Sequence, residues 1–168
     1  MNNQFDVIWI GTGQSTLSII PRIAKAGKTV AVIESGDFGG TCVNTGCTPT
    51  KKLVAAARAI FQAQRGTDFG FSVSQLEIDF EKVMAPQKDG RASASQWIEQ
   101  HLTQLENCTV FNGEAKFFDS HTVEVNGEQL RGEHIVISAG ARPRVPEVKG
   151  IENIEFLTNE NLLDLTEL

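Results

Sequence analysis

A glycine-rich turn between two short apolar runs is the feature that most constrains the fold. Residues 5–10 and 29–33 are short and mostly apolar, as is typical of strands buried in a parallel sheet. Residues 14–25 lie between them and carry apolar side chains at spacings of three and four, which predicts a helix that ends at Gly27. A strand, a helix and a strand within about 30 residues form a βαβ unit. The sequence therefore predicts an α/β fold built on a parallel sheet.

The turn itself, residues 11–13, has the composition that a dinucleotide requires. Gly11 permits a tight turn, and Gly13 lets the backbone approach a pyrophosphate at the positive N-terminus of the helix. Glu34 ends the second apolar run, where its carboxylate is placed to accept hydrogen bonds from a ribose. Thr16 stands where the usual fingerprint has its third glycine, and we expect it to push the helix outward and weaken binding. A glycine turn without a ligand is the alternative interpretation.

Two of the three cysteines, Cys42 and Cys47, lie in a second glycine-rich stretch. Four residues separate them, so the pair can meet across about one helical turn and close a small disulfide ring. At a helix N-terminus the dipole stabilises the thiolate of such a pair, which suits exchange chemistry. A metal site needs further ligands, and the three histidines have no ligand-like spacing to the pair. The sequence favours a redox disulfide and no bound metal, with a metal site or inert thiols as the alternatives.

The rest of the chain predicts two longer helices and a group of short strands. Helical spacing of apolar residues predicts helices over 52–64 and from 79 to about 105, with Gly90 interrupting or bending the second. After Asn107 the pattern changes to a period of two, which predicts short strands over 109–111, 115–118, 122–125 and 129–130. We expect a small antiparallel β-meander over about 107–130, followed by a further buried strand over 133–138.

Charge and hydropathy exclude several classes of protein. Lys and Arg number 15 against 21 Asp and Glu, and a net charge of −6 argues against binding to nucleic acid or to an anionic membrane. The apolar runs fall far short of the roughly 20 residues that span a bilayer. The first residues carry no basic region of the kind that opens a secretory signal. We therefore expect a cytoplasmic protein with no nucleic-acid or membrane partner.

Three segments carry a resemblance to a known family. Residues 39–51, GGTCVNTGCTPTK, resemble the redox-active signature of the class I pyridine nucleotide–disulfide oxidoreductases, and are most similar to the mercuric-reductase-like branch. Residues 113–115 resemble the family's turn against the adenine of FAD, and residues 138–146 resemble the segment that approaches FAD again. The resemblance covers essentially the whole chain.

The resemblance implies a fold, a cofactor and roles for individual residues. The fold would be an α/β, Rossmann-like FAD-binding parallel sheet with helices and the small antiparallel β-meander. Cys47 would be the flavin-proximal thiol and Cys42 the interchange thiol that faces the substrate. Lys51 would lie near flavin N5, with its neighbour Lys52 as the alternative. The residues expected to bind FAD are Gly11, Gly13, Gln14, Ser15, Glu34, Ser35, Gly40, Thr41, Lys51, Ala115, Ala139 and Gly140.

The resemblance also implies a function for the longer parent protein. Electrons would pass from NAD(P)H to FAD, then to the Cys42–Cys47 disulfide, and then to a small disulfide, dithiol or metal-ion substrate. Residues 1–168 would be the N-terminal part of the FAD-binding domain, without the NAD(P) and dimerisation domains that the family uses for turnover and homodimer formation. This chain alone would then be inactive. A stand-alone flavin- or dithiol-binding module and a non-catalytic interaction protein are the alternatives.

Overall fold

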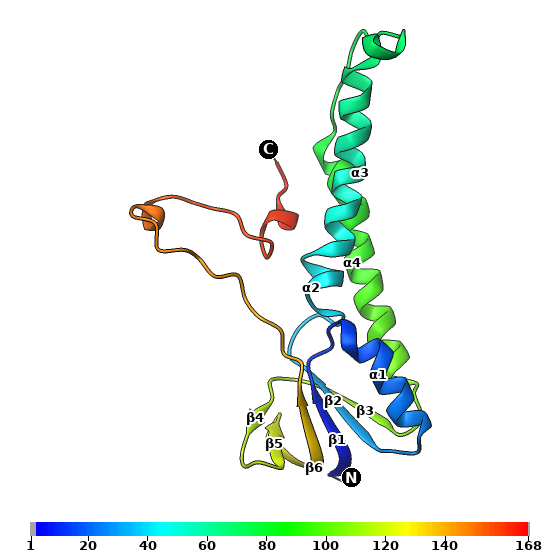
Figure 1. Cartoon of the computed structure of the whole chain (residues 1–168), viewed down its shortest axis with the longest axis vertical. Helices are drawn as coiled ribbons and strands as arrows, with labels where there is room; N and C mark the ends of the chain where they lie inside the picture. Colours follow the sequence, from blue (N-terminus) through cyan, green and yellow to red (C-terminus); the bar gives the residue numbers. More distant parts are fainter. Residues whose placement is uncertain (1–2, 168) are drawn as a thin grey trace.

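A six-stranded sheet forms the base of the molecule in the computed structural model, which describes residues 3–167 (Figure 1). Its order is β3-β2-β1-β6-β5-β4, and β3, β2, β1 and β6 are parallel to one another. The strands are β1 (Gln4–Ile10), β2 (Val30–Glu34), β3 (Cys108–Asn112), β4 (Lys116–Phe117), β5 (Thr122–Val125) and β6 (Glu128–Ile137). The parallel α/β sheet that the sequence predicts is confirmed.

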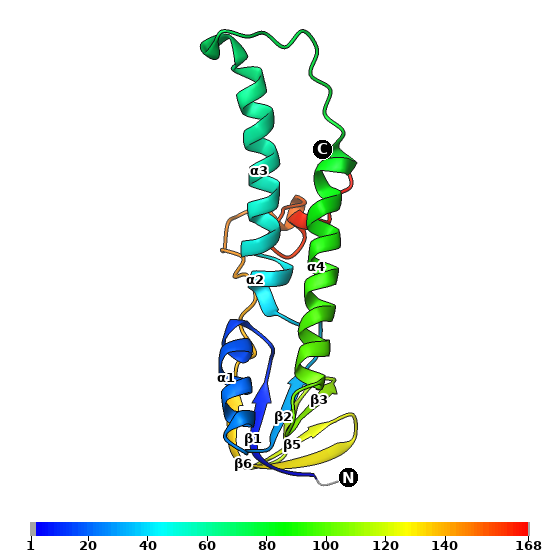
Figure 2. The ribbon, with the colours of Figure 1, turned by 90° about the vertical axis from the view of Figure 1, so that its right-hand side faces the viewer.

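Two helices cover one face of this sheet, and one of the two extends beyond the ends of the strands, where it forms a long hairpin with a third helix (Figure 2). The helices are α1 (Gln14–Lys25), α2 (Gly40–Asn44), α3 (Cys47–Gln64) and α4 (Phe80–Thr103). The C-terminal part of α4 returns to the sheet beside α1, and its Ile98 and Leu102 pack with Ile20 of α1. No helix among residues 3–167 is both long enough and apolar enough to cross a membrane.

The core has one half on each face of the sheet because successive side chains of a strand point to opposite faces. Val7 and Trp9 of β1 pack toward α1 and α4. Ile8, between them, packs on the other face against the antiparallel strands, with Val123 and Leu130. The antiparallel strands therefore bury the apolar side chains on one face of the parallel sheet, and the helices bury those on the other face.

The antiparallel part is smaller than the sequence predicts. Residues 108–112 form β3, which pairs parallel to β2 in the register Val30↔Cys108, so they belong to the parallel sheet and not to the meander. The strands expected at 129–130 and 133–138 are one continuous strand, β6, which pairs antiparallel to β5 and parallel to β1. A period of two identifies a strand but not its partner, which explains both errors.

The helix α4 continues through Gly90, contrary to the expected interruption. Its start is as expected, because the Asp79 side chain accepts a hydrogen bond from the backbone N–H of Lys82 at 3.1 Å. Gly90 instead provides room for Lys52 of α3, whose Nζ donates to the carbonyl of Pro86 at 3.0 Å. This glycine therefore serves the packing of α3 on α4.

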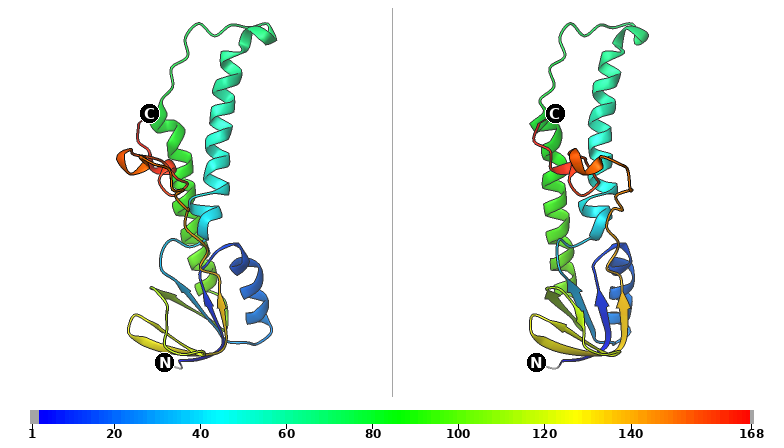
Figure 3. Two further views of the ribbon diagram at one scale, coloured as in Figure 1. Left: turned by 60° about the vertical axis from the view of Figure 1, so that its left-hand side comes forward. Right: turned by 90° about the vertical axis from the view of Figure 1, so that its left-hand side faces the viewer.

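The segment that follows β6 leaves the sheet and ends beside α4 (Figure 3). Its Leu163 is fully buried, and the Leu163 carbonyl accepts a hydrogen bond from Gln87 Nε2 at 2.7 Å. Arg91 of α4 pairs with Asp164 at 2.6 Å and also donates to the carbonyl of Asn44, the last residue of α2, at 3.2 Å. One arginine thus connects this segment to α2.

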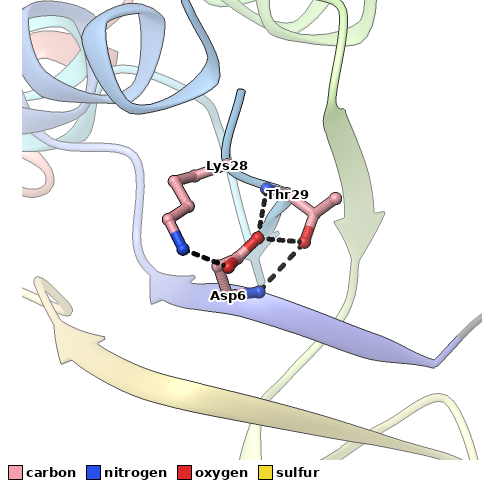
Figure 4. Close-up of polar contacts among 3 residues, drawn as sticks. All are labelled: Asp6, Lys28 and Thr29. Carbon is pink, nitrogen blue, oxygen red and sulfur yellow. Dashed lines mark hydrogen bonds and ion pairs between the residues drawn. The ribbon is translucent and has the colours of Figure 1, made fainter. Parts of the chain in front are cut away.

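A polar cluster joins the start of β1 to the start of β2 (Figure 4). One oxygen of the Asp6 carboxylate pairs with Lys28 Nζ at 2.8 Å, and the other accepts from the N–H and the hydroxyl of Thr29, each at 2.8 Å. The Asp6 N–H donates back to the Thr29 hydroxyl at 3.0 Å. The hydrogen bond from Lys28 and those from Thr29 hold the pKa of the Asp6 carboxyl well below its usual range.

We expect Asp6→Asn to lower the melting temperature at neutral pH and to do so less in acid. The folded-state pKa lies below the unfolded-state value, so the charged carboxylate stabilises the fold above about pH 4 and this stabilisation is lost as the pH falls further. Thermal unfolding of both proteins between pH 7 and pH 3 measures the difference. A difference in melting temperature that stays constant over this range would contradict the role assigned to the charge.

Candidate functional site

A cavity of about 630 Å³ lies where the parallel strands end and α1 and α2 begin. Ligands of open α/β sheets bind at this edge, outside the carboxyl ends of the strands. All the expected site residues except Lys51 line it: Gly11, Gly13, Gln14, Ser15, Glu34, Ser35, Gly40, Thr41, Cys42, Cys47, Ala115, Ala139 and Gly140. Four further lining residues, Gly39, Gly113, Ser138 and Ala141, lie in the segments that carry the family resemblance, whereas Ile10, Thr12, Ile33 and Asp37 were not predicted.

Glycines allow the backbones of three loops to come into contact at this cavity. These loops are residues 11–13, 39–40 and 138–139. Gly11 has a φ of +96°, and a Cβ placed on it would lie 2.7 Å from the backbone carbon of Ser138. Gly40 has a φ of +60°, and its Cβ would lie 2.9 Å from the Cα of Gly13. Both positions therefore require glycine for conformation and for space. A Cβ on Gly13, by contrast, would meet nothing within 4 Å, so the N-terminus of α1 has open space beside it.

The Glu34 carboxylate is held in place at the end of β2 by four hydrogen bonds. Oε2 accepts from the N–H of Thr12 at 2.9 Å and from the Thr12 hydroxyl at 2.6 Å. Oε1 accepts from the N–H groups of Ser35 and Gly36 at 2.9 and 3.0 Å. The carboxylate is therefore fixed at the cavity wall before any ligand binds. Thr12 is fully buried and supplies two of these four hydrogen bonds. The sequence did not predict that this residue, which lies between two glycines, would bind the Glu34 carboxylate.

The two cysteines come from consecutive helices and face the same cavity. Cys42 lies in the middle of α2 and is half-buried, whereas Cys47 is the first residue of α3 and is exposed. A hydrogen bond with Cys47 is the main cause that raises the pKa of the Cys42 thiol. Burial raises the pKa of Cys42 further, while the positive charge of Lys51 opposes the shift. Both cysteines are free thiols in this structure, and both line the cavity.

Asn44, the last residue of α2, joins this helix to the loop that precedes it, and the sequence did not predict this role. Its amide nitrogen donates to the carbonyls of Asp37, Phe38 and Gly40 at 3.2, 3.0 and 3.2 Å. The carbonyls of Asp37 and Phe38 belong to the loop that leads into α2, and that of Gly40 belongs to the first residue of the helix. A side chain that ties a loop to the helix following it fixes both, so Asn44 holds the backbone from which Cys42 projects.

The lysines and the third cysteine lie apart from the cavity lining. Lys51 is exposed at the start of the second turn of α3. It lies near enough to Cys42 to affect the pKa of that thiol, but it is not among the residues that line the cavity. Lys52, the alternative to Lys51, also lies outside the cavity lining and donates a hydrogen bond to the Pro86 carbonyl of α4. Cys108 is the first residue of β3 and packs against the core on the helix-covered face of the sheet, and burial raises the pKa of its thiol to about 11. Residues 3–167 contain no cluster of three or more His, Cys, Asp or Glu able to hold a metal.

The curated proteins that this chain resembles include mercuric reductases and dihydrolipoyl dehydrogenases. The mercuric reductase of Lysinibacillus sphaericus is 34% identical over 168 residues, which are 99% of this chain and 30% of that protein. The dihydrolipoyl dehydrogenase of Chlamydia trachomatis is 30% identical over 173 residues, which are 100% of this chain and 37% of that protein. This chain thus spans about a third of the length of the curated relatives it matches.

A solved structure agrees with these sequence relatives. The HOCl-induced flavoprotein disulfide reductase RclA from Escherichia coli superposes with a TM-score of 0.77 at 30% identity, over 98% of this chain and 35% of that one. The family model described as pyridine nucleotide-disulphide oxidoreductase matches residues 5–167. The resemblance read from the sequence is confirmed, and the chain belongs to the pyridine nucleotide-disulphide oxidoreductase family.

Proposed function

We propose that this chain is the FAD-binding, dithiol-bearing part of a disulfide oxidoreductase. The observation that carries the proposal is a single cavity in which a glycine loop, a fixed carboxylate and two adjacent thiols come together. The open space beside Gly13 suits a pyrophosphate at the N-terminus of α1, because uncapped N–H groups and the helix dipole favour an anion there. Glu34 suits the ribose hydroxyls, and Ala115 lines the wall where the adenine would lie.

The thiols supply the exchange chemistry. In this proposal the Cys42 thiolate attacks one sulfur of a substrate disulfide, which forms a mixed disulfide and releases the first substrate thiol. The Cys47 thiolate then attacks the Cys42 sulfur, which closes the Cys42–Cys47 disulfide and releases the second thiol. Two electrons and two protons pass from the cysteine pair to the substrate. Bound FAD supplies the two-electron chemistry that returns the pair to the dithiol, with NAD(P)H as the source in the full-length parent.

The substrate is proposed as a small disulfide, a dithiol or a metal ion. The names of the relatives, mercuric reductase and dihydrolipoyl dehydrogenase, support these classes. In the same proposal the full-length parent is a homodimer, and this chain alone does not turn over with NAD(P)H. Lys51 remains the residue expected near flavin N5.

Titration with FAD, followed by its visible absorption and fluorescence, tests the proposal on this chain. Saturable binding with a perturbed flavin spectrum is the expected result. If FAD added in excess remains free at every protein concentration tested, the proposed cofactor role is wrong for this chain.

Substitution of the cysteines should separate their roles. After mild dithiol reduction of the FAD complex, we expect Cys47→Ser to lose the long-wavelength absorbance that a thiolate beside the flavin produces. We expect Cys42→Ser to enhance it, because the exposed Cys47 thiol then has no neighbouring thiol with which to pair. Cys108→Ser is the control and should leave the spectrum unchanged, because Cys108 lies outside the cavity. The reverse pattern for Cys42 and Cys47 would overturn the assignment.

A further inference from the structure

Thr16 replaces the third glycine of the fingerprint, and its hydroxyl connects two buried groups. Trp9 is 4% exposed, and its indole N–H donates to Thr16 Oγ1 at 3.1 Å. Thr16 is fully buried, and its hydroxyl donates in turn to the carbonyl of Gly11 at 3.1 Å. A buried indole N–H needs an acceptor, so Trp9 and a hydroxyl at position 16 depend on each other. The threonine thus takes part in a network that no glycine could form.

The same network continues from Gly11 to the carboxylate at the cavity wall. The Gly11 carbonyl and the Thr12 N–H belong to one planar trans peptide group, so they point in opposite directions. On the far side, the Thr12 N–H donates to Glu34 Oε2 at 2.9 Å, and the Thr12 hydroxyl donates to the same oxygen at 2.6 Å. A continuous hydrogen-bonded path therefore runs from the buried indole, through one hydroxyl and one peptide group, to Glu34.

We propose that Thr16, supported by Trp9, is a positioning residue for the nucleotide site. By holding the Gly11 carbonyl toward the interior, it keeps the Thr12 N–H directed at Glu34 and the carboxylate oriented for ribose hydroxyls. Hydrogen bonds in such a chain also polarise one another in the low-dielectric interior, because the Thr16 hydroxyl and the Gly11–Thr12 peptide group each accept one hydrogen bond and donate another. This inference rests on the proposed function and deepens it, since it assigns binding strength for the adenosine half of FAD to a residue outside the cavity lining.

Three substitutions at position 16 separate positioning from packing. Thr16→Val keeps the shape and removes the hydroxyl, Thr16→Ser keeps the hydroxyl and removes the methyl group, and Thr16→Gly restores the fingerprint residue. We expect Thr16→Val and Thr16→Gly to weaken FAD binding about tenfold, the equivalent of one lost hydrogen bond near 1.4 kcal/mol. Thr16→Ser should stay within about twofold of the wild type. Tighter binding by Thr16→Gly would overturn the proposal, because it would mean that the threonine only crowds the turn.

A double-mutant cycle tests whether Thr16 acts through Glu34. In a Glu34→Gln background, Thr16→Val should change FAD affinity by less than about twofold, because the carboxylate that it positions is no longer present. The same tenfold loss in both backgrounds would contradict action through Glu34. ADP, which carries the ribose and the pyrophosphate without the flavin, is the second probe and should show the same dependence.

Amide hydrogen exchange gives a readout that needs no cofactor. The Thr12 N–H should exchange about tenfold faster in Thr16→Val and in Trp9→Phe than in the wild type, and at the wild-type rate in Thr16→Ser. The Gly11 N–H is the local control, because it donates to the Ile33 carbonyl at 2.8 Å and lies outside the path. Unchanged Thr12 exchange would overturn the inference. If the wild-type chain fails to bind FAD while Thr12 exchange responds as expected, the proposed function fails and the positioning of Glu34 stands.

Discussion

Gly11→Ala is expected to destabilise the chain by about 2–5 kcal/mol and to abolish FAD binding. The φ of +96° is unfavourable for any L side chain, and a new Cβ would lie 2.7 Å from the backbone carbon of Ser138 and 3.1 Å from the backbone nitrogen of Ala139. The main chain is unable to move aside freely, because the Gly11 N–H donates to Ile33 and the Gly11 carbonyl accepts from Thr16. Relief of the clash would therefore displace the end of β6 or break these bonds.

Gly27→Ala is the matched control for this prediction. Gly27 follows α1 with a φ of +79°, but a Cβ there would meet nothing within 4 Å. Alanine at position 27 should therefore cost only the conformational strain, about 1–2 kcal/mol, and leave FAD binding intact. Denaturant unfolding of the three proteins, followed by FAD titration of those that fold, measures both effects. Equal losses at the two positions would show that the contact with residues 138–139 contributes nothing.

Ile20→Ala is expected to cost about 2–5 kcal/mol of unfolding free energy. Ile20 is fully buried on the inner face of α1, in the cluster that Val7 and Trp9 of β1 form with α4. Removal of its outer carbons leaves a cavity beneath the helix that begins at the glycine loop. The neighbouring Pro21 restricts how far this helix can adjust to fill the space, because its ring fixes the backbone.

Ile19→Ala makes the same chemical change one residue earlier in the same helix. Ile19 is 39% exposed, so its truncation should change the unfolding free energy by no more than about 0.5 kcal/mol. Urea unfolding of both variants gives the comparison directly. A loss at Ile19 comparable to that at Ile20 would mean that α1 packs differently from the arrangement described here.

Local chemistry made the parallel sheet and the cavity predictable from the sequence. The turn at Gly11 and Gly13, the acidic residue Glu34 and the spacing of Cys42 and Cys47 each follow from short-range requirements of backbone conformation or reaction chemistry. All five line one cavity because the carboxyl ends of parallel strands share an edge. Once the fold class was known, these short-range patterns were sufficient to predict that these five residues line the cavity.

The features that the sequence did not predict depend on partners that lie far along the chain. The alternation of side chains along β3 predicts a strand but does not distinguish a place in the meander from a place in the parallel sheet. The strand lies beside β2 because the long helix α4 returns the chain to the sheet. Gly90 was expected to break a helix, but its function is to admit Lys52 from another helix. Thr16 was expected to disturb the turn, and the acceptor that it provides for Trp9 became visible only in three dimensions.

The pairing of β1 with β6 has a consequence for synthesis of the chain. β1 is at the centre of the sheet, yet one of its edges is covered by a strand made much later, with Gln4 opposite Arg131. Ribosomes add about 5–20 residues per second, so this edge stays open for many seconds in the nascent chain. An uncovered apolar strand edge is a template for pairing with other chains. Molecules released before Ile137 is made therefore carry an open strand edge in the middle of their core, and we expect them to aggregate more than chains that include β6.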